Sequence, residues 1–136
     1  MADSRRPRGP IDTSVVMDLE LIEPADLPLE LAVSAISMAE LAAGSHATAD
    51  PAERARRQDR LQRAEATFEP LPVDAAVARA YGRVYAAIGG AGRKPRGRRA
   101  VDLFIAATAV AAGLPLYTRN PDDFAGLSEA LEVVTI

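Results

Sequence analysis

The most constraining feature of the sequence is the stretch Arg99–Gly113, RAVDLFIAATAVAAG, in which almost every residue after Val101 is apolar or small. A helix that is apolar on nearly every face is normally enclosed by other elements of the fold. Gly113 is typical of the position just after a helix, and Pro115 prevents the helix from continuing. The sequence therefore predicts a buried helix, followed by a short strand over residues 114–118.

One acidic residue, Asp102, lies near the beginning of this helix. A carboxylate in the first turn interacts favourably with the helix dipole, by about 0.3–1 kcal/mol, and this is its simplest explanation. The alternative is that Asp102 belongs to a functional site together with other isolated acids. The sequence around Asp102 alone does not decide between a helix-dipole residue and a member of a functional site.

Strand-like and helix-like segments alternate along the rest of the chain. Strands are expected near residues 10–11, 31–36, 114–118 and 131–136, and further helices over 38–43, 51–68 and 74–88. This alternation with short loops predicts an α/β domain with a central, mostly parallel sheet flanked by helices on both sides. We expect residues 1–9 to form a flexible N-terminal tail and residues 10–136 a single domain.

Composition excludes several kinds of chemistry. The 136 residues contain no cysteine and one histidine, His46, which argues against disulfides, thiolate metal sites, a Ser-His-Asp triad and a multi-histidine zinc site. The N-terminal residues lack the apolar segment of a secretory signal, and no uncharged run is long enough for a membrane span. We expect a cytoplasmic protein without a membrane partner.

Isolated acidic and amide side chains lie where the strands are expected to end. Asp12 follows the first strand, Glu40 lies a few residues past the second, and Asn120 and Asp123 follow the strand over 114–118. In parallel α/β sheets, ligands bind outside the carboxyl ends of the strands. Asp102 begins the helix that leads into that strand and can point into the same crevice. This shared placement favours a common site.

Such a group of carboxylates indicates a metal ion. Two carboxylates about 4 Å apart repel each other by roughly 4 kcal/mol at an effective dielectric constant of 20, unless a proton or a cation neutralises them. Oxygen ligands without histidine or cysteine suit Mg²⁺ or Mn²⁺. Such ions can activate water for phosphodiester hydrolysis. Glu40 keeps a structural alternative, since Ser37 stands at the capping-box spacing before it.

Basic residues are clustered although the net charge is −3. Five lie close to Asp102 without interleaved acids and are our candidates for binding RNA phosphates: Arg93, Lys94, Arg96, Arg98 and Arg99. Five arginines between Arg54 and Arg63 alternate with acidic residues, so this second cluster is expected to form surface ion pairs, and a role in binding RNA stays open.

Taken together, these motifs resemble the PIN-domain ribonucleases, most closely the VapC toxins of bacterial toxin–antitoxin pairs. The resemblance runs from Ile11 to Ile136 and rests on DTS at Asp12, SAISMAELAAG around Glu40, AVDLFIAATAVAAGLPLYT around Asp102, and TRN before Asp123. It implies a PIN fold and an endoribonuclease dependent on Mg²⁺, with Mn²⁺ able to substitute. It also implies a homodimer, a VapB-type antitoxin partner, and tRNA or rRNA as substrate.

The resemblance also implies individual roles. By matching position, the catalytic residues would be Asp12, Glu40, Asp102 and Asp123, and the metal ligands Asp12, Glu40, Asp102 and Asn120. Thr13, Ser14 and Thr118 would be polar support, with Arg119 beside the site. The first strand is shorter here than is usual in the family.

The alternative to a metal-dependent endoribonuclease is a catalytically weak PIN scaffold that binds RNA or a protein partner without depending on metal. A receiver-like phosphoacceptor domain is disfavoured, because it needs a lysine after the last core strands and the only lysine, Lys94, lies in a Pro/Gly-rich loop.

Overall fold

The computed structural model describes residues 5–89 and 97–136. Its centre is a four-stranded sheet in the order β2-β1-β3-β4, in which every pairing is parallel. The strands are β1 (Arg8–Ile11), β2 (Glu30–Val33), β3 (Leu116–Thr118) and β4 (Val133–Thr135). From β1 the chain continues to β2 on one side of that strand and returns later to β3 on its other side, so the topological switch point of the sheet lies between β1 and β3. This arrangement confirms the predicted parallel α/β fold.

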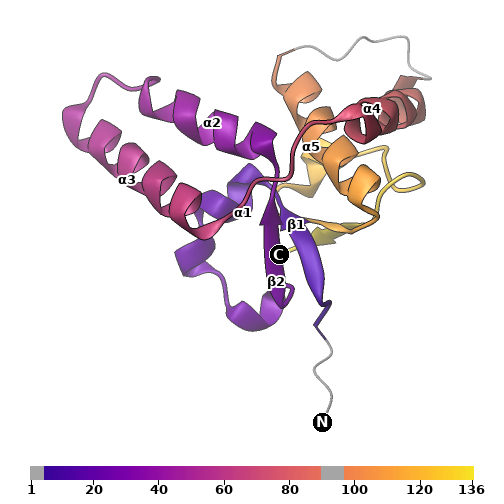
Figure 1. Cartoon of the computed structure of the whole chain (residues 1–136), viewed down its shortest axis with the longest axis horizontal. Coiled ribbons are helices and arrows are strands. Elements are labelled where there is room, and N and C mark those ends of the chain that lie inside the picture. The colour runs from indigo at the N-terminus through magenta and orange to yellow at the C-terminus, as the bar shows by residue number, and fades with distance from the viewer. Residues whose placement is uncertain (1–4, 90–96) are drawn as a thin grey trace.

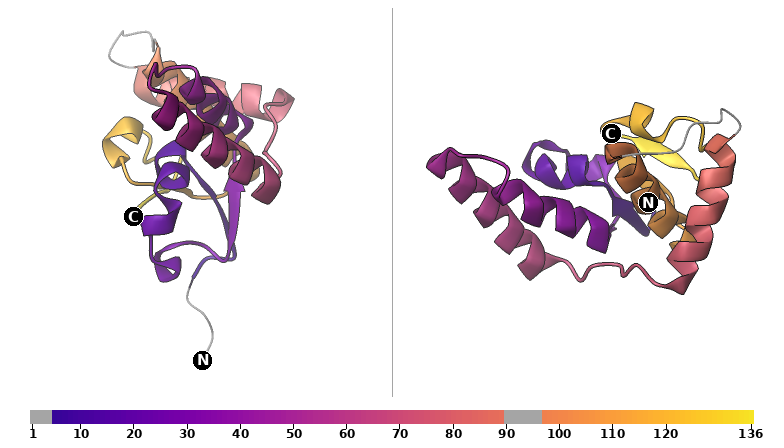
Figure 2. Two further views of the ribbon diagram at one scale, coloured as in Figure 1. Left: turned by 90° about the vertical axis from the view of Figure 1, so that its left-hand side faces the viewer. Right: turned by 90° about the horizontal axis from the view of Figure 1, so that it is seen from above.

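The helices form two groups that lie on opposite sides of the sheet (Figures 1 and 2). They are α1 (Thr13–Met17), α2 (Ala35–Ser45), α3 (Pro51–Thr67), α4 (Ala75–Ile88) and α5 (Arg98–Ala112), with the short 3-10 helices η1 (Leu19–Leu21), η2 (Pro24–Asp26) and η4 (Pro121–Phe124). Helix α2 packs against α3, and α4 packs against α5. Within the described residues, no helix combines the length and the apolar character needed to cross a membrane.

Two hydrophobic clusters explain why both faces of the sheet are covered. Neighbouring residues of a strand point to opposite faces. Accordingly, Leu116 of β3 packs in a cluster with α4 and α5, whereas Tyr117 packs in a cluster with β1, α1 and α2. Helices on both faces were predicted, and the two clusters confirm them.

The buried helix is α5, and its boundaries follow the predicted stop signals. Gly113 adopts φ 68°, in the left-handed region that favours glycine. Gly97 is the N-cap, so Asp102 is the fifth residue of the helix, and the first turn contains no acidic residue. The interpretation of Asp102 as a first-turn dipole residue is therefore wrong, and this buried carboxylate needs another explanation.

The first strand begins earlier than predicted. Residues 1–9 were expected to form a flexible tail, but Arg8 and Gly9 belong to β1 and pair with Glu30 and Leu31 of β2. Gly9 is required here because a Cβ atom would lie 2.7 Å from Tyr117 Cε1. The Gly-Pro sequence that resembles a turn is thus part of a central strand, beside a large ring on β3.

The second strand and the helix after it also differ from the prediction. Strand β2 ends at Val33 and not at Ile36, because Ser34 caps α2 by accepting a hydrogen bond from the Ser37 backbone N–H (3.0 Å). The proposed capping box between Ser37 and Glu40 is therefore wrong. Glu40 lies in the middle of α2 and does not cap its beginning.

Candidate active site

Asp12 lies at the carboxyl end of β1, where it is buried and caps α1. Its Oδ1 accepts hydrogen bonds from Ser14 Oγ (2.6 Å) and the Val15 backbone N–H (3.1 Å). Its Oδ2 accepts one from Thr118 Oγ1 (2.6 Å), and Thr118 is fully buried at the end of β3. The ends of the two central strands thus hold this carboxylate in one orientation.

Glu40 reaches the same region from α2 through a series of hydroxyl groups. Thr13 Oγ1 donates a hydrogen bond to Glu40 Oε1 (2.6 Å) and lies 3.0 Å from Ser37 Oγ, which can donate to it. Ser34 Oγ lies 3.3 Å from Ser37 Oγ. The sequence did not assign either serine to the site. The helix was expected to begin at residue 38, three residues too late, and Ser37 was considered only as its cap. These hydroxyl groups fix Glu40 against α1.

Asp102 is a buried carboxylate of α5, 6% exposed, and its pKa is raised from 3.8 to about 6. Burial is the largest cause, followed by repulsion from Asp123, while Arg98 lowers the pKa. Repulsion from Glu40 and Asp12 raises it further. The fold thus brings three of the predicted acids close enough to raise the pKa of the fourth, Asp102, although the four come from the end of β1, α2, α5 and η4.

The two described arginines of the predicted RNA-binding group have different surroundings. Arg98 Nη1 lies 3.7 Å from Glu40 Oε2 and so places a positive charge at the edge of the acidic group. Arg99 donates hydrogen bonds to the backbone carbonyls of Asp123 and Ala125, which anchors η4 against α5 and positions Asp123. The other three members of the group, Arg93, Lys94 and Arg96, lie outside the described residues.

Asn120 and Arg119 contribute to the site through their backbones. The Asn120 N–H donates to Thr118 Oγ1 (2.9 Å), and the Arg119 N–H donates to Ser14 Oγ (3.2 Å). The Arg119 guanidinium pairs with Asp18 (3.4 Å). Across residues 5–89 and 97–136, the Asn120 side chain makes no hydrogen bond, and Asn120 is exposed.

The donor set fits a divalent cation. In this conformation no three carboxylate or imidazole groups of the described chain are arranged so as to hold one ion. However, the repulsion that raises the pKa of Asp102 comes from three other acids, and a divalent cation would relieve it. All these ligands are hard oxygens without histidine or cysteine, which suits Mg²⁺ or Mn²⁺.

The comparisons with known proteins agree with this fold. The family model for the PIN domain matches residues 11–129, which is most of the chain. The chain therefore belongs to the PIN domain family.

Within that family, the chain is most clearly similar to the VapC group. It is 37% identical to ribonuclease VapC5 of Mycobacterium tuberculosis over 131 residues, covering 94% of this chain and 93% of the relative. It is 35% identical to ribonuclease VapC4 of the same organism over 133 residues, covering 95% and 97%. The solved structure of VapBC-5, a toxin–antitoxin system of M. tuberculosis, matches with a TM-score of 0.79 and 34% identity, over 96% of this chain and 99% of that one.

Proposed function

We propose that this protein is a VapC-type endoribonuclease that depends on a divalent metal. One observation carries the proposal: three acids from separate elements lie near enough to Asp102, at the carboxyl edge of the sheet, that their repulsion and burial raise the pKa of Asp102 to about 6. Groups of titratable residues with perturbed pKa values are typical of catalytic sites. The whole-chain similarity to two ribonucleases gives the reaction class.

Asp12, Glu40, Asp102 and Asn120 are the residues that would hold Mg²⁺ or Mn²⁺, with Asp123 as an accessory acid. When bound, such an ion supplies Lewis-acid chemistry that activates water and stabilises the leaving oxygen of a phosphodiester. Asn120 is exposed at the start of η4 and makes no side-chain hydrogen bond within the described residues, so its amide oxygen is free to serve as a ligand.

The surrounding side chains hold these acids in place. The hydroxyl groups of Ser14 and Thr118 fix the two oxygens of Asp12, and Thr13 fixes Glu40. Such hydrogen bonds hold the oxygens of a carboxylate in fixed positions, as in sites where the ligands of a metal ion are themselves hydrogen-bonded. Arg98, beside Glu40, offers a positive charge to a phosphate that approaches the acids.

The proposed substrate is structured RNA such as tRNA or rRNA, and the proposed partner is a VapB-type antitoxin. The partner follows from the similarity to VapBC-5, which is described as a toxin–antitoxin system. The homodimer and the cytoplasmic location expected from the sequence remain predictions.

The test is cleavage of a mixed tRNA and rRNA pool by purified protein without antitoxin. Wild-type protein, Asp102→Asn and the control Asp26→Asn are incubated with Mg²⁺, with Mn²⁺ and with EDTA. Asp26 is exposed and remote from the acidic group, so its variant removes the same charge elsewhere. Cleavage by wild type and control, abolished by EDTA and by Asp102→Asn, is the expected result.

The opposite result would favour the catalytically weak scaffold. The ion pair between Arg98 and Glu40, which neutralises one acid without metal, is the observation that keeps this alternative open. It predicts RNA that stays intact under every condition while the folded protein binds RNA equally well with Mg²⁺ and with EDTA.

A further inference from the structure

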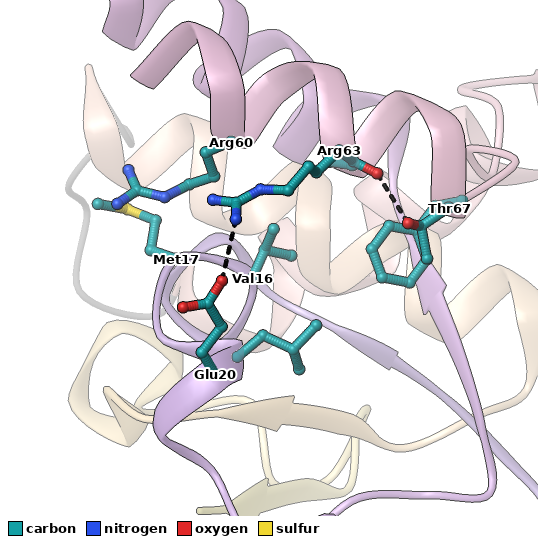
Figure 3. A pocket seen from close by; sticks show the side chains of 9 residues that line it. Val16, Met17, Glu20, Arg60, Arg63 and Thr67 are labelled. Atoms are coloured by element: carbon teal, nitrogen blue, oxygen red, sulfur yellow. Dashed lines mark hydrogen bonds and ion pairs between the residues drawn. The ribbon is translucent and has the colours of Figure 1, made fainter. Parts of the chain in front are cut away.

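Two neighbouring cavities lie along α3, and they share Met17 and Arg60. The first has a volume of about 220 Å³ and is lined by both apolar and polar side chains of α1, η1 and α3 and by Phe68 (Figure 3). The second has a volume of about 200 Å³, and its lining includes Thr13 and Glu40 of the acidic site together with Arg57, Arg60 and Arg98. The second cavity therefore connects the proposed catalytic group with α3.

Arg60 differs from the other arginines of α3. Arg56 and Arg57 pair with Glu53 at 2.6 and 3.0 Å, Arg63 pairs with Glu20 at 3.1 Å, and Arg54 donates to the Thr48 carbonyl at 2.9 Å. Within residues 5–89 and 97–136, Arg60 makes no hydrogen bond or ion pair, although its side chain is partly buried. Figure 3 shows it extended beside Met17, separate from the pair between Arg63 and Glu20.

This arrangement leaves an uncompensated cation next to a site for a polyanion. A strand of RNA that places one phosphate among four acids is repelled there unless cations receive its neighbouring phosphates. Three arginines line the same cavity as Glu40. Arg57 and Arg98 are already paired with acids, so Arg60 is the cation available for this purpose. A guanidinium binds phosphate oxygens through two parallel N–H bonds, which makes it better suited to phosphate than an ammonium group.

We propose that the RNA strand leaves the acidic site along this second cavity, and that Arg60 binds a backbone phosphate next to the cleaved bond. The inference rests on the proposed function, and it makes Arg60 a substrate-binding residue of α3. A carboxylate of a protein partner is the competing ligand for the same guanidinium. RNA is favoured because the cavity opens on Glu40, where the substrate backbone must pass.

The test measures binding of a fluorescently labelled single-stranded RNA pool in EDTA over a series of salt concentrations. The proteins are wild type, Arg60→Gln, Arg60→Lys and the control Arg56→Gln, which removes an exposed arginine outside both cavities. Losing one phosphate contact lowers the slope of log K against log salt by about 0.7 for single-stranded nucleic acid. We expect this reduction for Arg60→Gln, and an unchanged slope for Arg60→Lys and for the control.

The possible outcomes distinguish a failure of the Arg60 inference from a failure of the proposed nuclease function on which it rests. If Arg60→Gln binds RNA with the wild-type slope while wild type cleaves RNA, the inference is overturned and the nuclease stands. If Arg60→Gln weakens binding of the antitoxin but not of RNA, the inference is also overturned, and the guanidinium belongs to the partner interface. If wild-type protein neither binds nor cleaves RNA, both proposals fall. Circular dichroism of each variant checks that it is folded.

Discussion

Replacing Asp102 by asparagine should stabilise the metal-free protein while it removes the nuclease activity. In wild type the ionised carboxylate is buried, and it faces Asp123, Glu40 and Asp12. The amide has nearly the same shape but no charge, so it avoids both the desolvation and the repulsion. If Asp102 is a ligand of the proposed cation site, a destabilising effect of its charge in the absence of the cation is expected.

The magnitude follows from the pKa of Asp102. Its rise from 3.8 to about 6 corresponds to about 3 kcal/mol of differential stability between the protonated and the ionised forms. Because the folded state binds this proton more tightly than the unfolded state, stability is lost as the pH rises through the interval from 3.8 to about 6. The variant should therefore gain most above that interval and nothing below it.

The assay is urea unfolding in EDTA at about pH 8 and about pH 3, on either side of the titration. We expect Asp102→Asn to exceed wild type by up to about 3 kcal/mol at the higher pH and to match it at the lower pH. The exposed Asp26→Asn variant controls for the change in net charge. Surface substitutions of this kind change stability by less than about 0.5 kcal/mol.

A variant that is less stable than wild type at the higher pH would refute the reasoning. It would mean that the Asp102 carboxylate is held by favourable contacts and is not under electrostatic strain. If the difference in unfolding free energy between the variant and wild type does not depend on pH, it arises from a change in packing around residue 102. The stability data would then give no support for a cation-binding site.

Three further predictions concern the metal, the hydroxyl groups and the first strand. Mg²⁺ at ten times its Kd should stabilise wild type by about 1.4 kcal/mol and Asp102→Asn by much less, as measured by thermal unfolding. Thr118→Val leaves Asp12 Oδ2 without its buried hydrogen-bond donor, which should lower the free energy of unfolding in urea by about 1–3 kcal/mol and slow RNA cleavage. Unchanged cleavage would show that Asp12 does not need this donor. Gly9→Ala places a Cβ atom 2.7 Å from Tyr117 Cε1 and should cost about 1–3 kcal/mol, with partial recovery in the double variant with Tyr117→Leu. Equal losses in the single and double variants would mean that the ring is not the cause.

Much of the architecture could be predicted because its signals are local. Pro51 follows the capping residue Asp50, and α3 begins there as expected. Gly113 ends α5 in the left-handed conformation. The grouping of Asp12, Glu40 and Asp102 followed from the rule that ligands bind at the carboxyl ends of parallel strands, which needs only the approximate position of each strand.

The features that could not be predicted from the sequence depend on contacts between residues far apart in the chain. The start of β1 was missed because the suitability of Gly9 is decided by the ring of Tyr117, far away in sequence. Ser34 and Ser37 are equally plausible caps in the sequence, and only the end of β2 selects Ser34.

The absence of a partner for Arg60 follows partly from the sequence. Ion pairs on a helix join residues three or four positions apart, and Arg56, Arg57 and Arg63 each have Glu53 or Asp59 at such a spacing, whereas Arg60 has no acid at either. In the folded chain, Glu20 and the Gly44 carbonyl bind Arg63 and Arg57 and not Arg60.

The hydrogen bond between Thr118 and Asp12 joins residues 106 positions apart and has a consequence for the timing of activity. During synthesis, Asp12 emerges from the ribosome long before β3, Asp102 and Asp123 do. A nascent chain therefore carries an isolated, unoriented aspartate and no nuclease site. We therefore expect the proposed nuclease site to assemble only after almost the whole length of the chain has been translated.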